Sequence, residues 1–178
     1  MLPLGTKAPD FKLRDTLTGE FYHLLDNIRD SKAFVIMFIC NHCPYVKHII
    51  HELIHLAKAY QAKGISFVAI SANDATNYPE DAPEKMAQLG KLLNFSFPYL
   101  YDETQSTAKA YHATCTPDFF IFDKNHLCVY RGQLDASRPN NNIPVTGQDI
   151  RSALENLLKG EPVNPQQLPS MGCNIKWK

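Results

Sequence analysis

The sequence predicts a single α/β domain built on a mixed central β-sheet. Two continuously apolar segments, residues 33–39 and 65–70, are typical of strands that are buried on both faces of a sheet. An amphipathic helix is predicted between them. Strand, helix and strand within about 40 residues form a right-handed unit whose two strands are parallel. The chain of 178 residues fits one domain, since domains usually contain roughly 100–200 residues.

The remaining elements follow from local patterns in chain order. Residues 10–13 and 20–24 alternate around Thr18-Gly19, which predicts a hairpin. The helix after Pro44 ends at Gly64, and its predicted inward face consists of Val46, Ile49, Ile50, Leu53, Leu56, Ala57 and Tyr60. Further on we expect a helix from Pro83, a short edge-like strand at 97–100, a short helix at 104–111, an antiparallel hairpin of 119–123 with 127–131, and a helix over 149–159.

The last segment, residues 161–178, holds three prolines and no periodicity. We interpret it as an extended tail that lies on the surface. The predicted organisation is therefore one α/β domain over residues 1–160, followed by a tail over residues 161–178.

Composition excludes several classes of protein. Eighteen Lys and Arg balance eighteen Asp and Glu, so the chain lacks the basic excess of a nucleic-acid binder. The longest apolar stretch, 33–40, has 8 residues, whereas a membrane span needs roughly 20. The first residues show neither a basic region nor a long apolar run, so no secretory signal is expected. We expect a cytoplasmic protein with no membrane partner.

The five cysteines, at positions 40, 43, 115, 128 and 173, carry the strongest functional signal. Their odd number in a chain of this size argues against a disulfide-stapled scaffold. In a reducing compartment, cysteines that occur in pairs more often serve catalysis, redox sensing or metal binding. Cys128 alternates inward on a predicted strand and is interpreted as a small core residue.

Cys40-Asn41-His42-Cys43 is a C-x-x-C motif between a buried strand and a helix. A thiolate at a helix N-terminus faces unpaired N–H groups and the positive end of the helix dipole, which lowers its pKa. The spacing lets the second sulfur attack a mixed disulfide formed by the first. The alternative, half of a zinc site, needs another Cys/His pair at ligand spacing, and the other cysteines are isolated. We therefore predict no metal.

The motif, followed later by Cys115-Thr116-Pro117, resembles the thioredoxin fold. The opening residues 5–11 are similar to the N-terminal signature of the alkyl hydroperoxide reductase/thiol-specific antioxidant (AhpC/TSA) branch, the peroxiredoxin-like redoxins. The resemblance runs from about residue 5 to residue 159, and residues 172–177 look like the ending of a peroxiredoxin-like subgroup.

The resemblance implies a role for each site residue. Cys40 is the expected exposed nucleophile and Cys43 the buried resolving thiol. Pro117 is the expected cis-proline, with Thr116 presenting backbone groups to a bound thiol or peptide. His42 favours the thiolate and makes the pair more oxidising, unless it is only an exposed residue at the helix start.

The order of the two cysteines stays open in the sequence. Proline disfavours helical geometry in the residue before it, so the helix is expected to begin at Pro44 with Cys43 near its N-cap. Cys43 would then be the more activated thiolate.

Several residues depart from the relatives. Met37 and Cys40 stand where peroxiredoxins require Thr or Ser three positions before the peroxidatic cysteine, and the expected arginine falls near Thr116. Arg131 or Arg138 would replace that arginine only if folding brings it close. The buried aspartate of ordinary thioredoxins is Phe34 here.

These departures favour thiol–disulfide exchange. A thiol peroxidase and a redox-dependent binding module remain alternatives. Cys115 and Cys173 are candidates for additional redox residues, although Cys115 also fits as a bystander and Cys173 as part of the tail packing around Trp177.

The same resemblance implies the partners. No bound cofactor is required, because electrons would come from an external dithiol reductant of the thioredoxin or glutathione type. The substrate is expected to be a disulfide or a peroxide. Relatives of this kind often dimerise, so a homodimer is allowed, but no residue pattern marks an interface.

Overall fold

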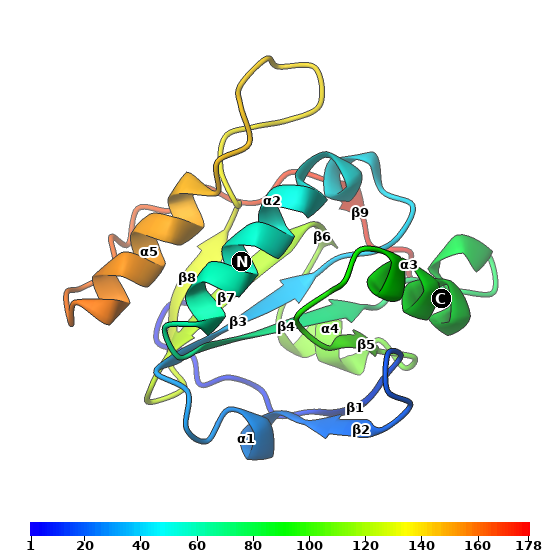
Figure 1. Ribbon diagram of the computed structural model, residues 1–178, viewed down its shortest axis with the longest axis horizontal. Helices are drawn as coiled ribbons and strands as arrows, with labels where there is room; N and C mark the ends of the chain where they lie inside the picture. Colours follow the sequence, from blue (N-terminus) through cyan, green and yellow to red (C-terminus); the bar gives the residue numbers. More distant parts are fainter.

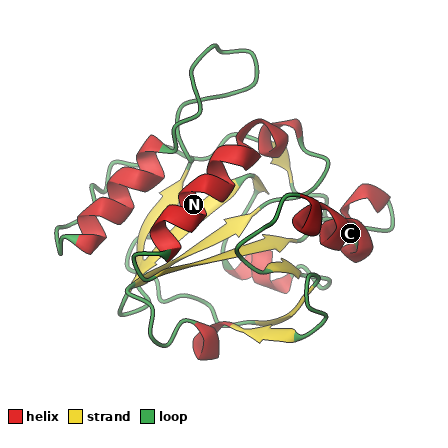
Figure 2. Ribbon diagram, in the orientation of Figure 1, coloured by secondary structure: helices red, strands yellow, loops and turns green.

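The computed structural model describes residues 1–178 and contains one seven-stranded sheet and one two-stranded sheet (Figures 1 and 2). The large sheet has the strand order β2-β1-β5-β4-β3-β7-β8. Its strands are β1 (Lys12–Asp15), β2 (Phe21–His23), β3 (Ala33–Phe38), β4 (Ile65–Ser71), β5 (Tyr99–Tyr101), β7 (Asp118–Asp123) and β8 (Cys128–Gly132). The small sheet pairs β6 (Cys115–Thr116) with β9 (Cys173–Asn174).

Helices cover both faces of the large sheet (Figure 1). One hydrophobic core lies under α2 (Pro44–Gln61), α3 (Pro83–Leu92) and α5 (Gln148–Leu158), and the other under α1 (Leu24–Asn27) and α4 (Ser106–Ala110). A 3-10 helix, η1 (Pro79–Asp81), precedes α3. None of the helices combines the length and the apolarity that crossing a bilayer requires.

The central strand β3 explains why its sequence is continuously apolar. All six of its residues are buried. Ala33, Val35 and Met37 belong to the core under α2, whereas Phe34, Ile36 and Phe38 belong to the opposite core. β3 pairs in parallel with β4 and antiparallel with β7, which confirms the predicted strand–helix–strand unit. The chain therefore leaves β3 at the middle of the sheet, two residues before Cys40.

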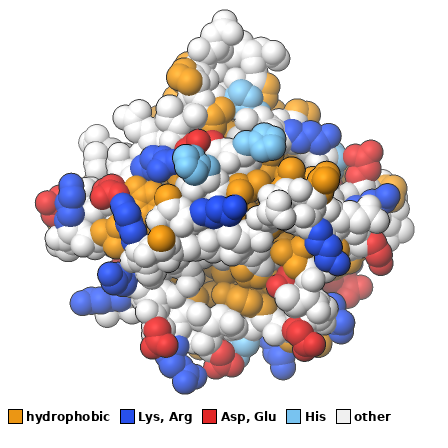
Figure 3. All heavy atoms as spheres, in the orientation of Figure 1, with side chains coloured by type: hydrophobic (Ala, Val, Ile, Leu, Met, Phe, Trp, Pro, Cys, Tyr) orange, Lys and Arg blue, Asp and Glu red, His pale blue; other side chains and the backbone are white.

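Most of the other predicted elements are confirmed. The hairpin of β1 and β2, the antiparallel pair β7 and β8, and the helices α2 to α5 occur where the patterns indicated. Every residue predicted on the inward face of α2 is buried. Lys and Arg side chains are interspersed with Asp and Glu on the face shown in Figure 3, in keeping with the balanced charge.

The prediction that residues 97–100 form an edge strand was wrong. The strand is β5, and it lies inside the sheet between β1 and β4. Its outer side pairs antiparallel with β1, through Arg14 opposite Tyr101 and Asp15 opposite Leu100. The N-terminal hairpin thus extends the sheet by two strands, and Tyr99 and Leu100 are fully buried as a result.

Candidate active site

The two cysteines of the C-x-x-C motif lie between the end of β3 and the start of α2. Helix α2 begins at Pro44, and Cys43 is its N-cap residue. The carbonyl of Cys43 accepts the first hydrogen bonds of the helix, from the N–H groups of Val46 (3.1 Å) and Lys47 (3.0 Å). Both cysteine side chains are buried, Cys40 at 1% and Cys43 at 0% exposure. The exposed position that the resemblance implied for Cys40 is therefore wrong: its sulfur lies against Thr116 of β6, which is in turn paired with β9.

Thr116 brings the two sulfurs together. The peptide bond between Thr116 and Pro117 is cis, as the resemblance implied. Cys40 Sγ lies 3.4 Å from Thr116 Oγ1, and Cys43 Sγ lies 3.3 Å from the Thr116 carbonyl oxygen. Residues separated by more than 70 positions in the chain thus form one contiguous sulfur and threonine cluster.

The surroundings of Cys40 and Cys43 shift the pKa values of the two thiols in opposite directions. The hydrogen bond with Cys43, burial and the charge of Asp81 all raise the pKa of Cys40. Hydrogen bonds from Cys40, Cys173 and Thr116 stabilise the ionised sulfur of Cys43 and lower its pKa in spite of its burial. The structure thus favours Cys43 as the thiolate, in agreement with its place at the helix N-cap.

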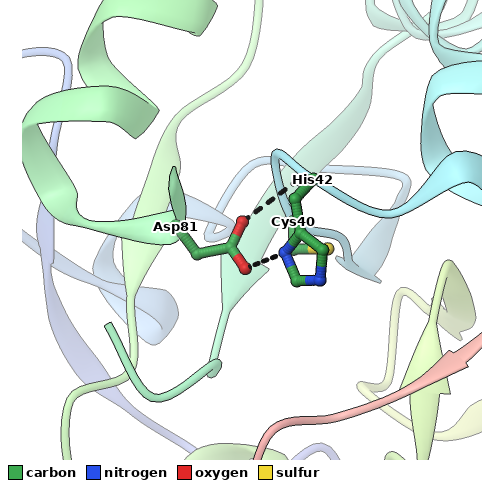
Figure 4. Close-up of side chains that lie close together, drawn as sticks. All are labelled: Cys40, His42 and Asp81. Atoms are coloured by element: carbon green, nitrogen blue, oxygen red, sulfur yellow. Dashed lines mark hydrogen bonds and ion pairs between the residues drawn. The ribbon is translucent and has the colours of Figure 1, made fainter. Parts of the chain in front are cut away.

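His42 is held by a buried carboxylate, that of Asp81 at the end of η1 (Figure 4). His42 Nδ1 pairs with Asp81 Oδ2, and Asp81 Oδ1 accepts hydrogen bonds from the backbone N–H groups of Asn41 (2.8 Å) and His42 (3.2 Å). Asn73 Nδ2 donates to Asp81 Oδ2 over 2.9 Å. The ring of His42 also stacks on Tyr78, with centroids 5.6 Å apart. His42 is therefore a fixed member of the site and not an unattached residue at the helix start.

The sequence alone assigns no role to Asp81 and indicates only a turn residue at Asn73. Asp81 follows Pro79-Glu80 in a polar loop, where an acidic residue is ordinary. Asn73 follows β4 and has the composition of a turn residue. The one signal for Asn73 was its place beyond the carboxyl end of a buried strand, which is where α/β proteins form their sites.

Cys40, His42 and Asp81 are also the residues whose potential metal-ligand atoms lie within 4.8 Å of one another. Both oxygens of Asp81 accept hydrogen bonds from nitrogen atoms. A hydrogen-bonded network accounts for these contacts. The absence of a metal stays a prediction.

Of the remaining candidate residues from the sequence, only Cys173 hydrogen-bonds a sulfur of the C-x-x-C motif. Burial raises the pKa of Cys115 to about 12, so this thiol is a poor nucleophile. Arg131 donates to the Leu2 carbonyl and to Gln167, and Arg138 donates to Gln133 and to nearby carbonyls. Neither arginine hydrogen-bonds a cysteine. Burial and the hydrogen bond with Cys43 also raise the pKa of Cys173, to about 11, but this residue lies on β9 with its Sγ 2.8 Å from Cys43 Sγ.

Asp118, the first residue of β7, gives the fold a specific pH dependence. Burial raises its pKa from 3.8 to about 6. The folded protein then holds the proton more tightly than the unfolded chain, so the contribution of this group to stability is lost as the pH rises from about 4 to about 6. The loss is on the order of 3 kcal/mol. We expect Asp118→Asn to remove this dependence.

Urea unfolding of the wild type and the variant at several pH values in this range measures the effect. Asp30→Asn is the matched control, because Asp30 is exposed. Equal slopes of stability against pH for Asp118→Asn and the wild type would contradict the prediction.

The fold and the cysteine motif define a class: a mixed sheet between two layers of helices, with a C-x-x-C sequence at the start of α2 opposite a cis-proline, is a thioredoxin-like redoxin. The AhpC/TSA family matches residues 4–131. The chain belongs to the AhpC/TSA family.

Solved structures share the fold of this chain. An uncharacterized conserved protein from Geobacillus kaustophilus is 60% identical, with a TM-score of 0.97 over 100% of this chain and 94% of that one. Two more distant structures share the fold. A thiol:disulfide interchange protein of the thioredoxin family from Chlorobium tepidum TLS has a TM-score of 0.66 at 16% identity, over 89% of this chain and 99% of that one. Peroxidoxin BcpB from Mycobacterium tuberculosis has a TM-score of 0.65 at 16% identity, over 90% and 98%. A search of curated protein sequences gave no match.

Membership in this family and this fold supports a thiol-based redox enzyme in general, with a reductant and an oxidised substrate as its partners.

Proposed function

We propose that the protein is a thiol–disulfide oxidoreductase whose redox pair is Cys40 and Cys43. The observation that carries the proposal is the contact of both sulfurs with Thr116, the residue before the cis-proline. A substrate sulfur that reaches Thr116 is within reach of both cysteines, which two successive exchange steps require.

The lower pKa of Cys43 supports an order of attack that is the reverse of the one implied by the resemblance. The Cys43 thiolate attacks one sulfur of the substrate disulfide, and the other substrate sulfur leaves as a thiolate. Cys40 then loses its proton and attacks Cys43 Sγ. The Cys40–Cys43 disulfide forms and the second substrate sulfur leaves, so the substrate gains two electrons and the pair loses two.

His42 and Asp81 support the second step. A ring nitrogen of His42 lies within 4.8 Å of Cys40 Sγ, and Asp81 fixes the orientation of the ring through Nδ1. A thiol with a raised pKa needs a nearby base before it attacks, and His42 is the base that this site offers. An external dithiol of the thioredoxin or glutathione type would return the oxidised pair to its reduced form.

The departures from peroxidases support this proposal over peroxide chemistry. Peroxide cleavage needs donors that stabilise the leaving oxygen, and both candidate arginines are engaged elsewhere in the structure. Peroxidase activity, the competing function, is therefore expected to be slow.

A direct comparison of two oxidants tests the proposal. Fully reduced protein is mixed with one equivalent of hydrogen peroxide or of a peptide disulfide, the rates are followed by stopped flow, and the products are mapped by mass spectrometry. We expect rapid oxidation by the disulfide and, when the peptide disulfide and dithiothreitol are then supplied in excess, many turnovers. With peroxide we expect no more than the rate of a free thiol with the same thiolate fraction.

A peroxide rate far above that value, with sulfenic acid on one cysteine, would establish a peroxidase instead. An internal disulfide that forms but supports no turnover would establish a redox-dependent binding module. Cys128→Ser is the matched control, since Cys128 is buried in the other core and contacts none of the site residues.

A further inference from the structure

The C-terminal strand β9 occupies the edge of the site at Thr116. It pairs antiparallel with β6, with Cys173 opposite Thr116 and Asn174 opposite Cys115. The N–H of Ile175 extends the pairing by donating to the Thr114 carbonyl over 3.1 Å. Because Thr116 contacts both active-site sulfurs, a strand paired there places its side chain directly beside them.

Contacts on the C-terminal side of β9 hold the strand in this position. Ile175 is 1% exposed and belongs to the core under α1 and α4. Lys176 N donates to Asn73 Oδ1 over 2.9 Å, and the Lys176 carbonyl accepts from the N–H of Asp74 over 2.8 Å. Gln105 Nε2 donates to the same carbonyl over 2.9 Å. Asn73 thereby joins the tail to Asp81 and to the site itself.

Close packing on the N-terminal side fixes the register. A Cβ on Gly172 would lie 1.9 Å from the Thr116 carbonyl oxygen, a distance at which nothing larger than hydrogen fits. Glycine at this position is thus a condition for β9 to lie against Thr116.

Strand β9 places the sulfur of Cys173 beside that of Cys43. Cys43 Sγ is 2.8 Å from Cys173 Sγ, although the two residues are 130 positions apart in the sequence. Cys173 is only half-buried, so a dithiol from solution can reach it more easily than it can reach Cys40 or Cys43.

We propose that Cys173 is a third redox cysteine, which takes the disulfide from the Cys40–Cys43 pair and thereby fastens β9 over the substrate edge. This inference rests on the proposed function, because that function supplies the oxidised pair. The tail then covers the site in a redox-dependent way. In the oxidised protein the Cys43–Cys173 disulfide links β9 covalently to the site, and in the reduced protein β9 can dissociate from it.

The exchange needs no further oxidant. After the reduced substrate has left and β9 has returned, the Cys173 sulfur attacks Cys43 Sγ. The Cys40–Cys43 bond breaks, the Cys43–Cys173 bond forms, and the proton lost by Cys173 is taken up by Cys40. The number of disulfides stays at one. Reduction of Cys43–Cys173 by an external dithiol restores three thiols.

Disulfide mapping of the full chain tests the proposal. The reduced protein is oxidised with one equivalent of a peptide disulfide, alkylated, digested without reduction and analysed by mass spectrometry. We expect the Cys43–Cys173 peptide to be the main product in the wild type. In Cys173→Ser the only product should be Cys40–Cys43. Absence of the Cys43–Cys173 peptide from the wild type, with Cys40–Cys43 in its place, would overturn the inference and leave the proposed function intact.

A rate measurement separates the cover from the disulfide itself. In the reduced protein β9 is held only by non-covalent contacts, so if it leaves the site open one-tenth of the time, Gly172→Ala should accelerate the reaction of a peptide disulfide with the reduced protein by about tenfold. Met171→Ala is the matched control, because Met171 is exposed and adjacent in the chain. Equal rates for Gly172→Ala and the wild type would show that β9 does not obstruct the site. If neither the wild type nor either variant reduces the peptide disulfide, the proposed function itself is contradicted.

Discussion

Asp81→Asn is expected to slow disulfide reduction by about tenfold to a hundredfold and to destabilise the fold by about 3 kcal/mol. Asp81 is fully buried and accepts hydrogen bonds from the N–H groups of Asn41 and His42, from the His42 ring and from Asn73. An amide in its place retains one acceptor oxygen and turns an NH₂ group against neighbouring donors. Buried donors left without an acceptor carry the full cost of their desolvation.

A readout of the thiols distinguishes positioning from mere folding. The negative charge of Asp81 is one of the causes that raise the pKa of Cys40. In Asp81→Asn the pKa of Cys40 should therefore fall, while exchange becomes slower because His42 loses its fixed orientation. Chemical denaturation, exchange kinetics and ultraviolet absorbance of the thiolate as a function of pH measure the three effects.

Glu80→Gln is the matched control for this experiment. It changes the adjacent carboxylate in the same way, but Glu80 is exposed and only its backbone carbonyl takes part in the site, as acceptor for Asn41 Nδ2. Wild-type stability and kinetics in Asp81→Asn would show that the His42–Asp81 pair contributes nothing to the reaction.

Elements defined by their own residues could be predicted from the sequence. β3 alternates between two cores, and this requires apolar side chains at every position. The inward face of α2 repeats at helical spacing and is buried throughout. The inner position of β5 could not be predicted, because it depends on pairing with β1 more than eighty residues earlier. Similarly, β9 contains two residues, too few to show any periodicity.

In the site, too, local patterns could be predicted from the sequence and long-range contacts could not. The C-x-x-C motif and Thr116-Pro117 are local patterns, and the structure brings them together. Asp81 reaches His42 only because η1 folds back over the start of α2, 39 positions away in sequence. Cys173 reaches Cys43 through the pairing of β9 with β6. The spacing of these residues in the sequence indicates neither of the two contacts.

Cys43→Ser is expected to abolish disulfide reduction, whereas Cys40→Ser should still form a mixed disulfide with the substrate and accumulate it. Cys43 has the lower pKa of the pair, so in the proposed mechanism it supplies the thiolate that attacks at neutral pH. Without Cys40 the covalent intermediate lacks its proposed resolving thiol. Mass spectrometry of the intact protein after reaction with a peptide disulfide detects the adduct. The Cys173→Ser background prevents Cys173 from resolving it.

Two substitutions at Cys40 test the physical origin of the thiolate. The largest cause that lowers the pKa of Cys43 is its hydrogen bond with Cys40. Serine retains a donor at this position and alanine removes it. The pKa of Cys43, followed by thiolate absorbance between about pH 4 and pH 9, should therefore rise further in Cys40→Ala than in Cys40→Ser.

The opposite assignment makes a different prediction. If Cys40 is the attacking residue, the stable adduct accumulates in Cys43→Ser, and Cys40→Ser fails to react. The position of the helix N-cap at Cys43, the carboxylate of Asp81 near Cys40, and the donors around Cys43 all act in the same direction. An adduct on Cys40 would mean that the approach of the substrate, and not the acidity of the thiols, determines which sulfur attacks.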